Sequence, residues 1–394
     1  MTIKSKFLNF TGYIEGYYGK LLSWDDRNKI INRLKTNGMS SYLYAPKEDI
    51  YHRLEWRKLY PQKILKSFIS FIEFSKIKKI EIIVGIAPGL DFDYNNLYKE
   101  FINKNHSDLK TLEKKCRQII SFGARNIALM FDDVDQSKYF QASNEKEEGF
   151  LHGKIANHLK KKLKVNIFVV PRIYSDELIL TNKYYLDMFF KTLNNEIQVF
   201  YCGSNIVAKS LSFQNLKIFS RFKNKIIIWD NFYANDYCPK RIFLGKLYKR
   251  TIKTNIMMNL TGMIETDLFL LDIFNIYLKK QNSVKKWKEI LNKHKVPHKF
   301  TLISPMVLHP FTILKDDKKN ISKYIDAIDF LLWKWKSPLS REWYPFLFNL
   351  KKDLLIRYDL ASTKQILKTE TLPLGEYLTK INDNLLKSDT KNAF

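Results

Sequence analysis

Eight short apolar runs recur within residues 1–280, and longer stretches with helical spacing separate them. The apolar runs are residues 13–15, 41–45, 80–86, 127–131, 166–170, 197–201, 226–229 and 256–259. In one of the helical stretches, residues 24–36, Ile30, Ile31 and Leu34 fall on one face behind Ser23, a typical helix-capping residue. Eight strands that alternate with helices over this length predict a (β/α)8 barrel.

An open, doubly wound sheet is the competing architecture. Polar motifs follow nearly every apolar run, as in a ring of loops around one axis, whereas an open sheet concentrates its ligand-binding groups at one switch point. From about residue 286 the alternation stops, and apolar residues such as Ile321, Ile325 and Ile328 recur at helical spacing. We therefore expect an α/β fold, with a (β/α)8 catalytic barrel at residues 1–285 and a small all-α domain at residues 286–394.

The chain carries 67 lysine and arginine residues against 40 aspartate and glutamate residues, a formal net charge of +27. Such an excess would ordinarily suggest a nucleic-acid or other anionic partner. The lysines, however, are spread through almost every expected helix. The denser groups, residues 160–164, 114–115 and 279–280, fall where we expect helices to end, and a helix C-terminus favours positive charge. We therefore expect no specific nucleic-acid partner.

Cysteine content and hydropathy indicate in which cellular compartment the protein is expected. Cys116, Cys202 and Cys238 are too few and too scattered for a disulfide framework or a zinc site. The first ten residues lack the apolar segment of a secretory signal, and no later stretch approaches the roughly 18 uncharged apolar residues of a membrane span. We expect a soluble, cytoplasmic protein. The seven histidines show no metal-site spacing, so we expect no metal and no cofactor.

The pair Asp132-Asp133 directly follows the apolar run that ends at Phe131. Barrels and doubly wound sheets place functional groups just beyond the carboxyl ends of their strands. Two adjacent carboxylates at such a position repel one another and suit general acid/base chemistry. The alternative interpretation is a solvated loop, formed together with Asp135, that caps the following helix.

Polar and aromatic residues also follow the other apolar runs. They include Gly16, Lys47, Tyr174, Trp229, Asn231, Asp236 and Asn259. Amides, carboxylates, a lysine and aromatic rings suit a polyhydroxylated, weakly charged ligand, because hydroxyl groups need hydrogen-bonding partners and sugar faces need apolar walls. A sugar is the ligand class that fits these residues best.

The order of these motifs resembles the catalytic domain of glycoside hydrolase family 84, the retaining β-N-acetylglucosaminidases that include protein O-GlcNAcases and some bacterial hyaluronidase-type enzymes. The segments that carry the resemblance are Gly12 to Gly19, Ser23-Trp24, Tyr44 to Asp49, Tyr51-His52-Arg53, Phe131-Asp132-Asp133, Trp229-Asp230-Asn231, Asn235-Asp236-Tyr237, Lys240 to Gly245, and Asn259. Each segment alone is a weak signal, but their shared order over residues 1–280 is specific.

The resemblance implies hydrolysis of terminal β-linked GlcNAc by substrate-assisted catalysis, in which the substrate's 2-acetamido oxygen attacks the anomeric carbon to form an oxazoline. On the family motif, Asp132 would orient the acetamido N–H, while Asp133 would protonate the leaving oxygen and later deprotonate water. We expect the neighbouring negative charge to keep Asp133 protonated to a higher pH than a free aspartate. Tyr174 would close the acetamido pocket. The other substrate-binding residues would be Gly16, Lys47, Trp229, Asn231, Asp236 and Asn259.

Two other functions stay open. A catalytically weak glycan- or polyanion-binding protein on the same barrel would use the lysines for affinity, although an intact Asp132 and Asp133 disfavour it. A hexosaminidase of the Asp-Glu pair type is disfavoured because position 133 is aspartate. The expected partner is a GlcNAc-containing glycan or glycoprotein. Its aglycone is open between a protein serine or threonine, another sugar and a cell-wall fragment, and so is the oligomeric state.

Overall fold

The computed structural model describes residues 9–94, 97, 106–134, 145–181, 184–212, 214, 226–313, 316–361 and 368–369. These residues form two compact units. The first unit takes its described residues from Met1–Tyr237, Phe243–His294 and His309–Phe311. The second unit takes its described residues from Cys238–Ile242, Lys295–Leu308 and Thr312–Phe394.

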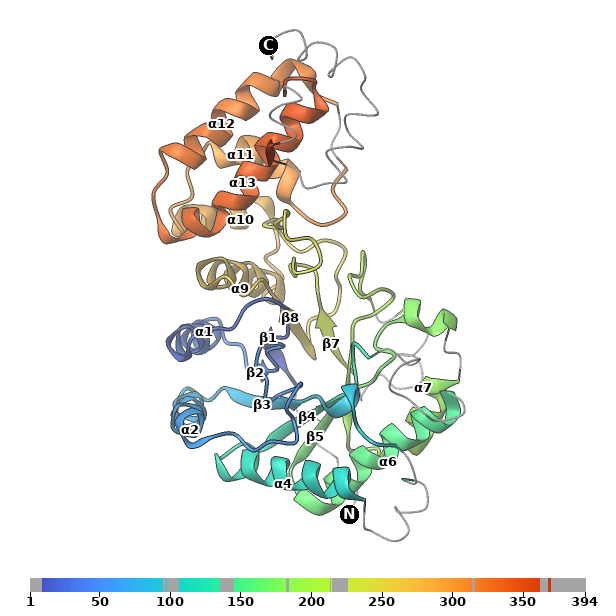
Figure 1. Ribbon diagram of the computed structural model, residues 1–394. Coiled ribbons are helices and arrows are strands. Elements are labelled where there is room, and N and C mark those ends of the chain that lie inside the picture. Colours follow the sequence, from blue (N-terminus) through green and yellow to red (C-terminus); the bar gives the residue numbers. More distant parts are fainter. Residues whose placement is uncertain are drawn as a thin grey trace. The chain divides into compact units, whose positions relative to one another are not determined.

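The first unit is built on eight parallel strands that pair in chain order and close into a barrel, with β8 paired to β1 (Figure 1). The strands are β1 (Thr11–Glu15), β2 (Ser41–Tyr44), β3 (Glu81–Ile86), β4 (Asn126–Met130), β5 (Asn166–Val170), β6 (Gln198–Tyr201), β7 (Ile226–Asp230) and β8 (Ile256–Asn259). Each coincides with a predicted apolar run. The predicted (β/α)8 barrel is therefore confirmed, and the open sheet is excluded.

Helices surround these strands (Figure 1). They are α1 (Trp24–Thr36), α2 (Gln62–Ile77), α4 (Ser107–Ser121), α6 (Glu145–Leu163), α7 (Tyr185–Thr192) and α9 (Ile264–Leu278), with short 3-10 turns η1 (Pro88–Leu90) and η2 (Asp176–Thr181). Helix α10 (Val284–Lys293) follows α9 and packs against it. Helix α1 begins as the sequence predicts, because the Ser23 side chain accepts a hydrogen bond from the Asp26 amide at 3.1 Å. Its buried face contains Ile30, Ile31 and Leu34.

Alternate residues along each strand point into the barrel and form one apolar core. This core includes Ile14 of β1, Ala45 just after β2, Met130 of β4, Trp229 of β7 and Met257 of β8. Because side chains alternate along a strand, the residue two positions beyond each of these again faces the barrel axis. It does so at the carboxyl ends of the strands, where barrel sites are built.

The second unit contains helices in its described part. They are α11 (Phe300–Ile303), η5 (Ser304–Val307), η6 (Lys318–Asn320), α12 (Ile321–Trp333) and α13 (Pro338–Arg357). Its interior is aromatic: the Trp343 ring lies 5.1 Å from Phe300 and 5.5 Å from Trp335, measured between ring centroids. Ile328 of the predicted apolar stripe is buried in the same unit, and so is Leu332, which follows it one helical turn later.

The lysine groups divide between helix ends and one buried position. Lysines 160–162 lie in the last turn of α6, and Lys279 is the C-terminal cap of α9, as predicted. The prediction for residues 114–115 is wrong, because they lie inside α4. Lys115 is buried and donates to the Lys58 carbonyl oxygen at 2.5 Å, and its ammonium group lies 3.8 Å from the centroid of the Tyr60 ring. Tertiary contacts, rather than a helix dipole, hold this lysine.

Candidate active site

Five residues that follow the strand cores at a spacing of two line one cavity at the mouth of the barrel. They are Gly16, Lys47, Asp132, Asn231 and Asn259. The cavity has a volume of about 830 Å³, and Asp133, Tyr174, Trp229 and Asp236 also line it. All nine site residues predicted from the sequence therefore meet in a single cavity.

An amide network orders the side of the cavity formed by β1, β7 and β8. The Gly16 amide donates to Asn259 Oδ1 at 3.2 Å, and Asn259 Nδ2 donates to Asn231 Oδ1 at 2.9 Å. Trp229 Nε1 donates to the same Asn231 oxygen at 2.8 Å. A Cβ atom at position 16 would lie 2.4 Å from the Trp229 ring, so only glycine fits there. The network fixes both asparagine side chains in the cavity wall.

Lys47 lies between the two adjacent carboxylates. Its Nζ is 2.6 Å from Asp132 Oδ2 and 3.2 Å from Asp133 Oδ2. Burial alone would lower the pKa of Lys47, but the two carboxylates raise that pKa above its ordinary value, so the ammonium group stays charged. The second oxygen of Asp132, Oδ1, is buried and has no hydrogen-bond partner among the described residues. That oxygen is an acceptor open to a ligand N–H.

Asp133 also accepts hydrogen bonds from two tyrosines. Tyr18 Oη donates to Asp133 Oδ2 and Tyr174 Oη donates to Asp133 Oδ1, both at 2.8 Å. Burial raises the pKa of Asp133, but Lys47 and the two hydroxyl groups outweigh burial and lower that pKa to about 2. The prediction of a raised pKa is therefore wrong for the protein without substrate. The pKa is lowered instead because Lys47 contacts both carboxylates and because the two tyrosine hydroxyl groups donate to Asp133.

Tyr18 reaches Asp133 because the turn after β1 is tied to two neighbouring loops. The Tyr18 amide donates to Asp236 Oδ2 at 3.0 Å, and the Gly19 amide donates to Glu48 Oε1 at 2.8 Å. Burial raises the pKa of Tyr18 to about 12 despite the nearby positive charge of Lys47. The hydroxyl group therefore stays protonated at neutral pH and acts as a donor.

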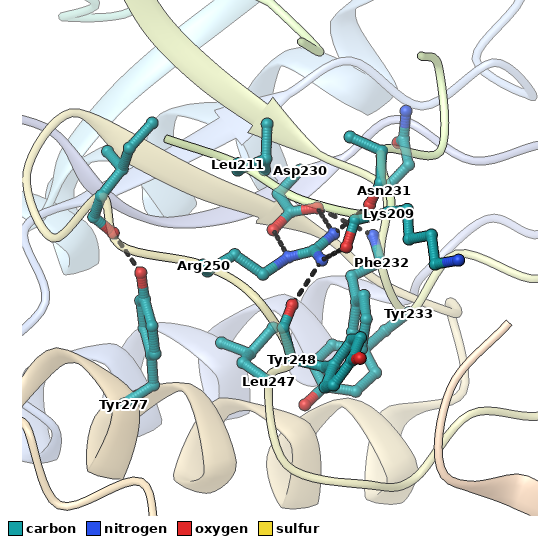
Figure 2. A network of polar contacts seen from close by, with 12 residues as sticks. Lys209, Leu211, Asp230, Asn231, Phe232, Tyr233, Leu247, Tyr248, Arg250 and Tyr277 are labelled. Atoms are coloured by element: carbon teal, nitrogen blue, oxygen red, sulfur yellow. Dashed lines mark hydrogen bonds and ion pairs between the residues drawn. The ribbon is translucent and has the colours of Figure 1, made fainter. Parts of the chain in front are cut away.

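A buried arginine holds the wall of the cavity that follows β6. Figure 2 shows the Arg250 guanidinium group against the carboxylate of Asp230, at 3.0 and 3.1 Å. The remaining N–H groups of Arg250 donate to the carbonyl oxygens of Ala208 at 2.6 Å, Lys209 at 3.1 Å and Tyr248 at 2.7 Å. All five donors of the guanidinium group are thus used. Lys209 lines the cavity, so this clamp fixes part of its wall.

Several cavity residues had no predicted role. Tyr18 lies in the segment Gly12 to Gly19, where an aromatic residue close to Gly16, a glycine predicted to bind substrate, is a usable signal. The Cys202 thiol accepts a hydrogen bond from Asn231 Nδ2 at 3.4 Å, and burial raises the pKa of Cys202 well above the ordinary range for a thiol. It is therefore a wall residue and a poor nucleophile. Others with no local signal are Ile206, Val207, Lys209 and Phe311.

Within the described ranges, no group of three or more histidine, cysteine, aspartate or glutamate residues has a metal-binding arrangement. The three cysteines are free thiols. Across the same described ranges, the helices are too short or too polar to cross a membrane.

A (β/α)8 barrel whose mouth combines paired carboxylates, asparagine amides and aromatic rings defines the class of barrel glycoside hydrolases. Residues 11–267 match the model of the family described as beta-N-acetylglucosaminidase. This match spans more than half of the chain, and the chain therefore belongs to the β-N-acetylglucosaminidase family. The resemblance read from the motifs is confirmed.

Similar proteins carry related names. The Protein O-GlcNAcase of Mus musculus is 30% identical over 261 residues, which cover 64% of this chain and 27% of the mouse protein. The Protein O-GlcNAcase of Rattus norvegicus shows the same identity and coverage. The chain thus spans about a quarter of the length of these curated relatives. A solved mutant of the Thermobaculum terrenum O-GlcNAc hydrolase shares the fold, with a TM-score of 0.73, 20% identity, and coverage of 98% of this chain and 90% of that one.

Proposed function

We propose that this protein hydrolyses terminal β-linked N-acetylglucosamine, including O-GlcNAc on serine or threonine of proteins, with retention of configuration. The observation that carries the proposal is the pair of carboxylates, Asp132 and Asp133, which line one cavity and share Lys47. Family membership and the names of the rodent relatives support it. A glycan- or polyanion-binding protein without turnover is the alternative.

In the first step, the acetamido carbonyl oxygen of the substrate attacks the anomeric carbon while the bond to the aglycone oxygen breaks. Asp132 accepts a hydrogen bond from the acetamido N–H through Oδ1, the buried oxygen without a partner among the described residues. Its negative charge stabilises the positive charge that develops on the acetamido group. The product of this step is an oxazoline.

Asp133 protonates the departing oxygen and then accepts a proton from the water that opens the oxazoline. A pKa of about 2 leaves Asp133 ionised in the free protein, so the substrate must change the surroundings of the carboxylate. When a sugar hydroxyl accepts a hydrogen bond from Lys47, the attraction between Lys47 and Asp133 weakens. The bound sugar also excludes water, and burial raises the pKa of a carboxyl group.

The remaining residues of the cavity hold the sugar. Asn231, Asn259 and Asp236 offer amide and carboxylate groups to its hydroxyls. Gly16 lines the cavity beside them, and its lack of a side chain leaves room for the Trp229 ring. The Trp229 ring provides an apolar surface. Tyr174 closes the acetamido pocket. Residue by residue, these are the roles that the family motif implies.

We also propose that residues 1–285 form the catalytic barrel, that residues 286–394 form a small all-α domain, and that the protein acts in the cytoplasm. Helices α11, α12 and α13 support the second part of this division. Free thiols at all three cysteines fit a reducing compartment. The partner is a GlcNAc-bearing glycan or glycoprotein, with no specific nucleic acid.

A comparison of chromogenic substrates tests this function. The β-N-acetylglucosaminide should be hydrolysed and the matching β-glucoside should not, because only the former carries the internal nucleophile. Replacing the acetyl hydrogens one by one with fluorine should slow hydrolysis steeply, since electron withdrawal weakens the attacking carbonyl oxygen. The measurement is the steady-state rate across the series.

Two results would count against the proposal. A rate that is insensitive to fluorination would exclude participation of the acetamido group. Binding of N-acetylglucosaminides without any turnover would favour the binding-protein alternative.

A further inference from the structure

The two catalytic carboxylates are adjacent in sequence, and this creates a geometric problem. Asp132 follows Met130 at a spacing of two and therefore faces the barrel axis with the core residues of β4. In an extended chain, Asp133 would point to the opposite side. Yet Lys47 contacts both carboxylates, so both side chains enter the same cavity. Some local feature must turn Asp133 back.

That feature is the backbone of Asp133 itself. Its φ angle is +55°, in the left-handed region that residues other than glycine rarely adopt. Aspartate tolerates this region better than most residues, but it still requires support from the surroundings. The alternation of side chains along β4 therefore directs Asp132 into the barrel, and the left-handed backbone ends this alternation at the next residue, Asp133.

The support comes from Arg53, in the segment after β2. Arg53 Nη2 donates to the Asp133 carbonyl oxygen at 2.8 Å, and the arginine is 7% exposed. Among the described residues, this is the single hydrogen bond of the Arg53 side chain. Its Nη1 is buried and has no hydrogen-bond partner there. The guanidinium group fixes the peptide plane that follows Asp133, and a charge-assisted bond of this kind is stronger than a neutral one.

We propose that Arg53 is a positioning residue, which holds Asp133 in the left-handed conformation and thereby directs its carboxylate toward the leaving-group oxygen. The inference rests on the proposed function, in which Asp133 is the general acid. Arg53 is not among the described residues that line the cavity. It acts on the reaction through Asp133, whose backbone it holds and whose pKa its positive charge helps to lower.

The experiment uses single-turnover rates on two substrates, an alkyl GlcNAc glycoside and a dinitrophenyl GlcNAc glycoside. The alkyl leaving group needs a proton from the acid, and the dinitrophenyl group does not. Arg53→Met should slow the alkyl substrate by about 10- to 100-fold, a part of the usual 10²–10⁴ for positioned proton transfer. The dinitrophenyl substrate should change by less than about threefold.

A double-mutant cycle shows whether Arg53 acts through Asp133. Asp133→Asn removes the acid and keeps a side chain that tolerates the left-handed region. In that background Arg53→Met should change the alkyl rate by less than about twofold, because its effect has already been lost. Arg53→Lys, which keeps the charge and one donor, should recover part of the alkyl rate.

Arg57 provides a matched control in the same segment. Its guanidinium group bonds to Asp91 and Asp108, which lie outside the cavity. Arg57→Met should leave the ratio of the two rates unchanged. If Arg53→Met fails to fold, Arg53→Lys is measured instead. It should also slow the alkyl substrate more than the dinitrophenyl substrate, by a smaller factor.

Equal slowing of both substrates by the Arg53 variants, or an undiminished effect in the Asp133→Asn background, would overturn the positioning role while leaving the proposed function intact. Equal slowing of both substrates by Asp133→Asn itself would instead remove Asp133 as the acid. The two failures are therefore distinguishable.

Discussion

At the scale of single residues, the charge of Lys47 is a main cause of the lowered pKa of Asp133. Its ammonium group lies 2.6 Å from Asp132 and 3.2 Å from Asp133, and its side chain is 2% exposed. Two adjacent carboxylates without it would repel each other and raise a pKa. With it, the pKa of Asp133 falls to about 2 against the effect of burial. Together with the hydroxyl groups of Tyr18 and Tyr174, this buried cation reverses the expected direction of the shift.

Lys47→Met should therefore raise the pKa of Asp133 in the unliganded protein toward or above the ordinary aspartate value of about 3.9. NMR titration of the side-chain carboxyl, assigned with Asp133→Asn, measures it. An Asp133 resonance that still titrates near pH 2 in the variant would show that Lys47 is not the cause.

The same shift predicts a pH dependence of stability. A carboxyl whose pKa is lowered by folding stabilises the folded protein above its unfolded-state pKa of about 3.9, and this contribution disappears as the pH falls through about 2. Between these values, wild type should lose more thermal stability than Lys47→Met. Thermal unfolding midpoints of both proteins across this range provide the comparison.

At the scale of elements, the barrel holds its irregular loops by buried polar side chains. Asp230 is the last residue of β7, and its carboxylate meets Arg250 with side chains that are 1% and 0% exposed. Arg250 then donates to the carbonyl oxygen of Lys209, beside the cavity (Figure 2), and to that of Ala208. The segment after β6, which is not part of the sheet, is thereby attached to strand β7.

Arg250→Met should lower the free energy of unfolding by about 3–5 kcal/mol, because it leaves the Asp230 carboxylate buried and unpaired. Urea unfolding measures the change. Adding Asp230→Leu to the variant should restore part of the loss, since replacing a buried pair by apolar residues is often nearly neutral. A cost below about 1 kcal/mol for the single variant would mean that the pair contributes little to stability.

At the scale of the whole molecule, the net charge of +27 is the dominant global property. Several lysines have local roles, at the ends of α6 and α9, inside α4, and between the carboxylates of the cavity. Scattered positive charge attracts phosphates without fitting a groove. It contributes a nonspecific, salt-sensitive attraction.

We expect weak binding to duplex DNA at about 0.01 M salt and its loss near about 0.15 M salt, where the screening length falls from roughly 30 to 8 Å. Fluorescence anisotropy with duplexes of two unrelated sequences should give equal affinities. Salt-resistant binding that prefers one sequence would instead support a nucleic-acid partner and revive the binding-protein alternative.

Local periodicity explains why the barrel strands and part of the site could be predicted from the sequence alone. The alternation of apolar runs and helices specified the eight strands, and the pleat, with a period of two, carried five of the nine site residues to one cavity, namely Gly16, Lys47, Asp132, Asn231 and Asn259. The covalent geometry of an extended backbone fixes this period of two residues. It can therefore be recognised from residues that are close together in the sequence.

The tertiary structure alone decided the turn at Asp133, its lowered pKa and the wall held by Arg250. The partners responsible are far away in the chain: Lys47 lies 85 residues from Asp132, and Tyr18 lies 115 residues from Asp133. Electrostatic fields and hydrogen bonds depend on distances in space. The sequence around Asp133 does not show which distant residues lie close to it. Those residues come together only when the barrel closes.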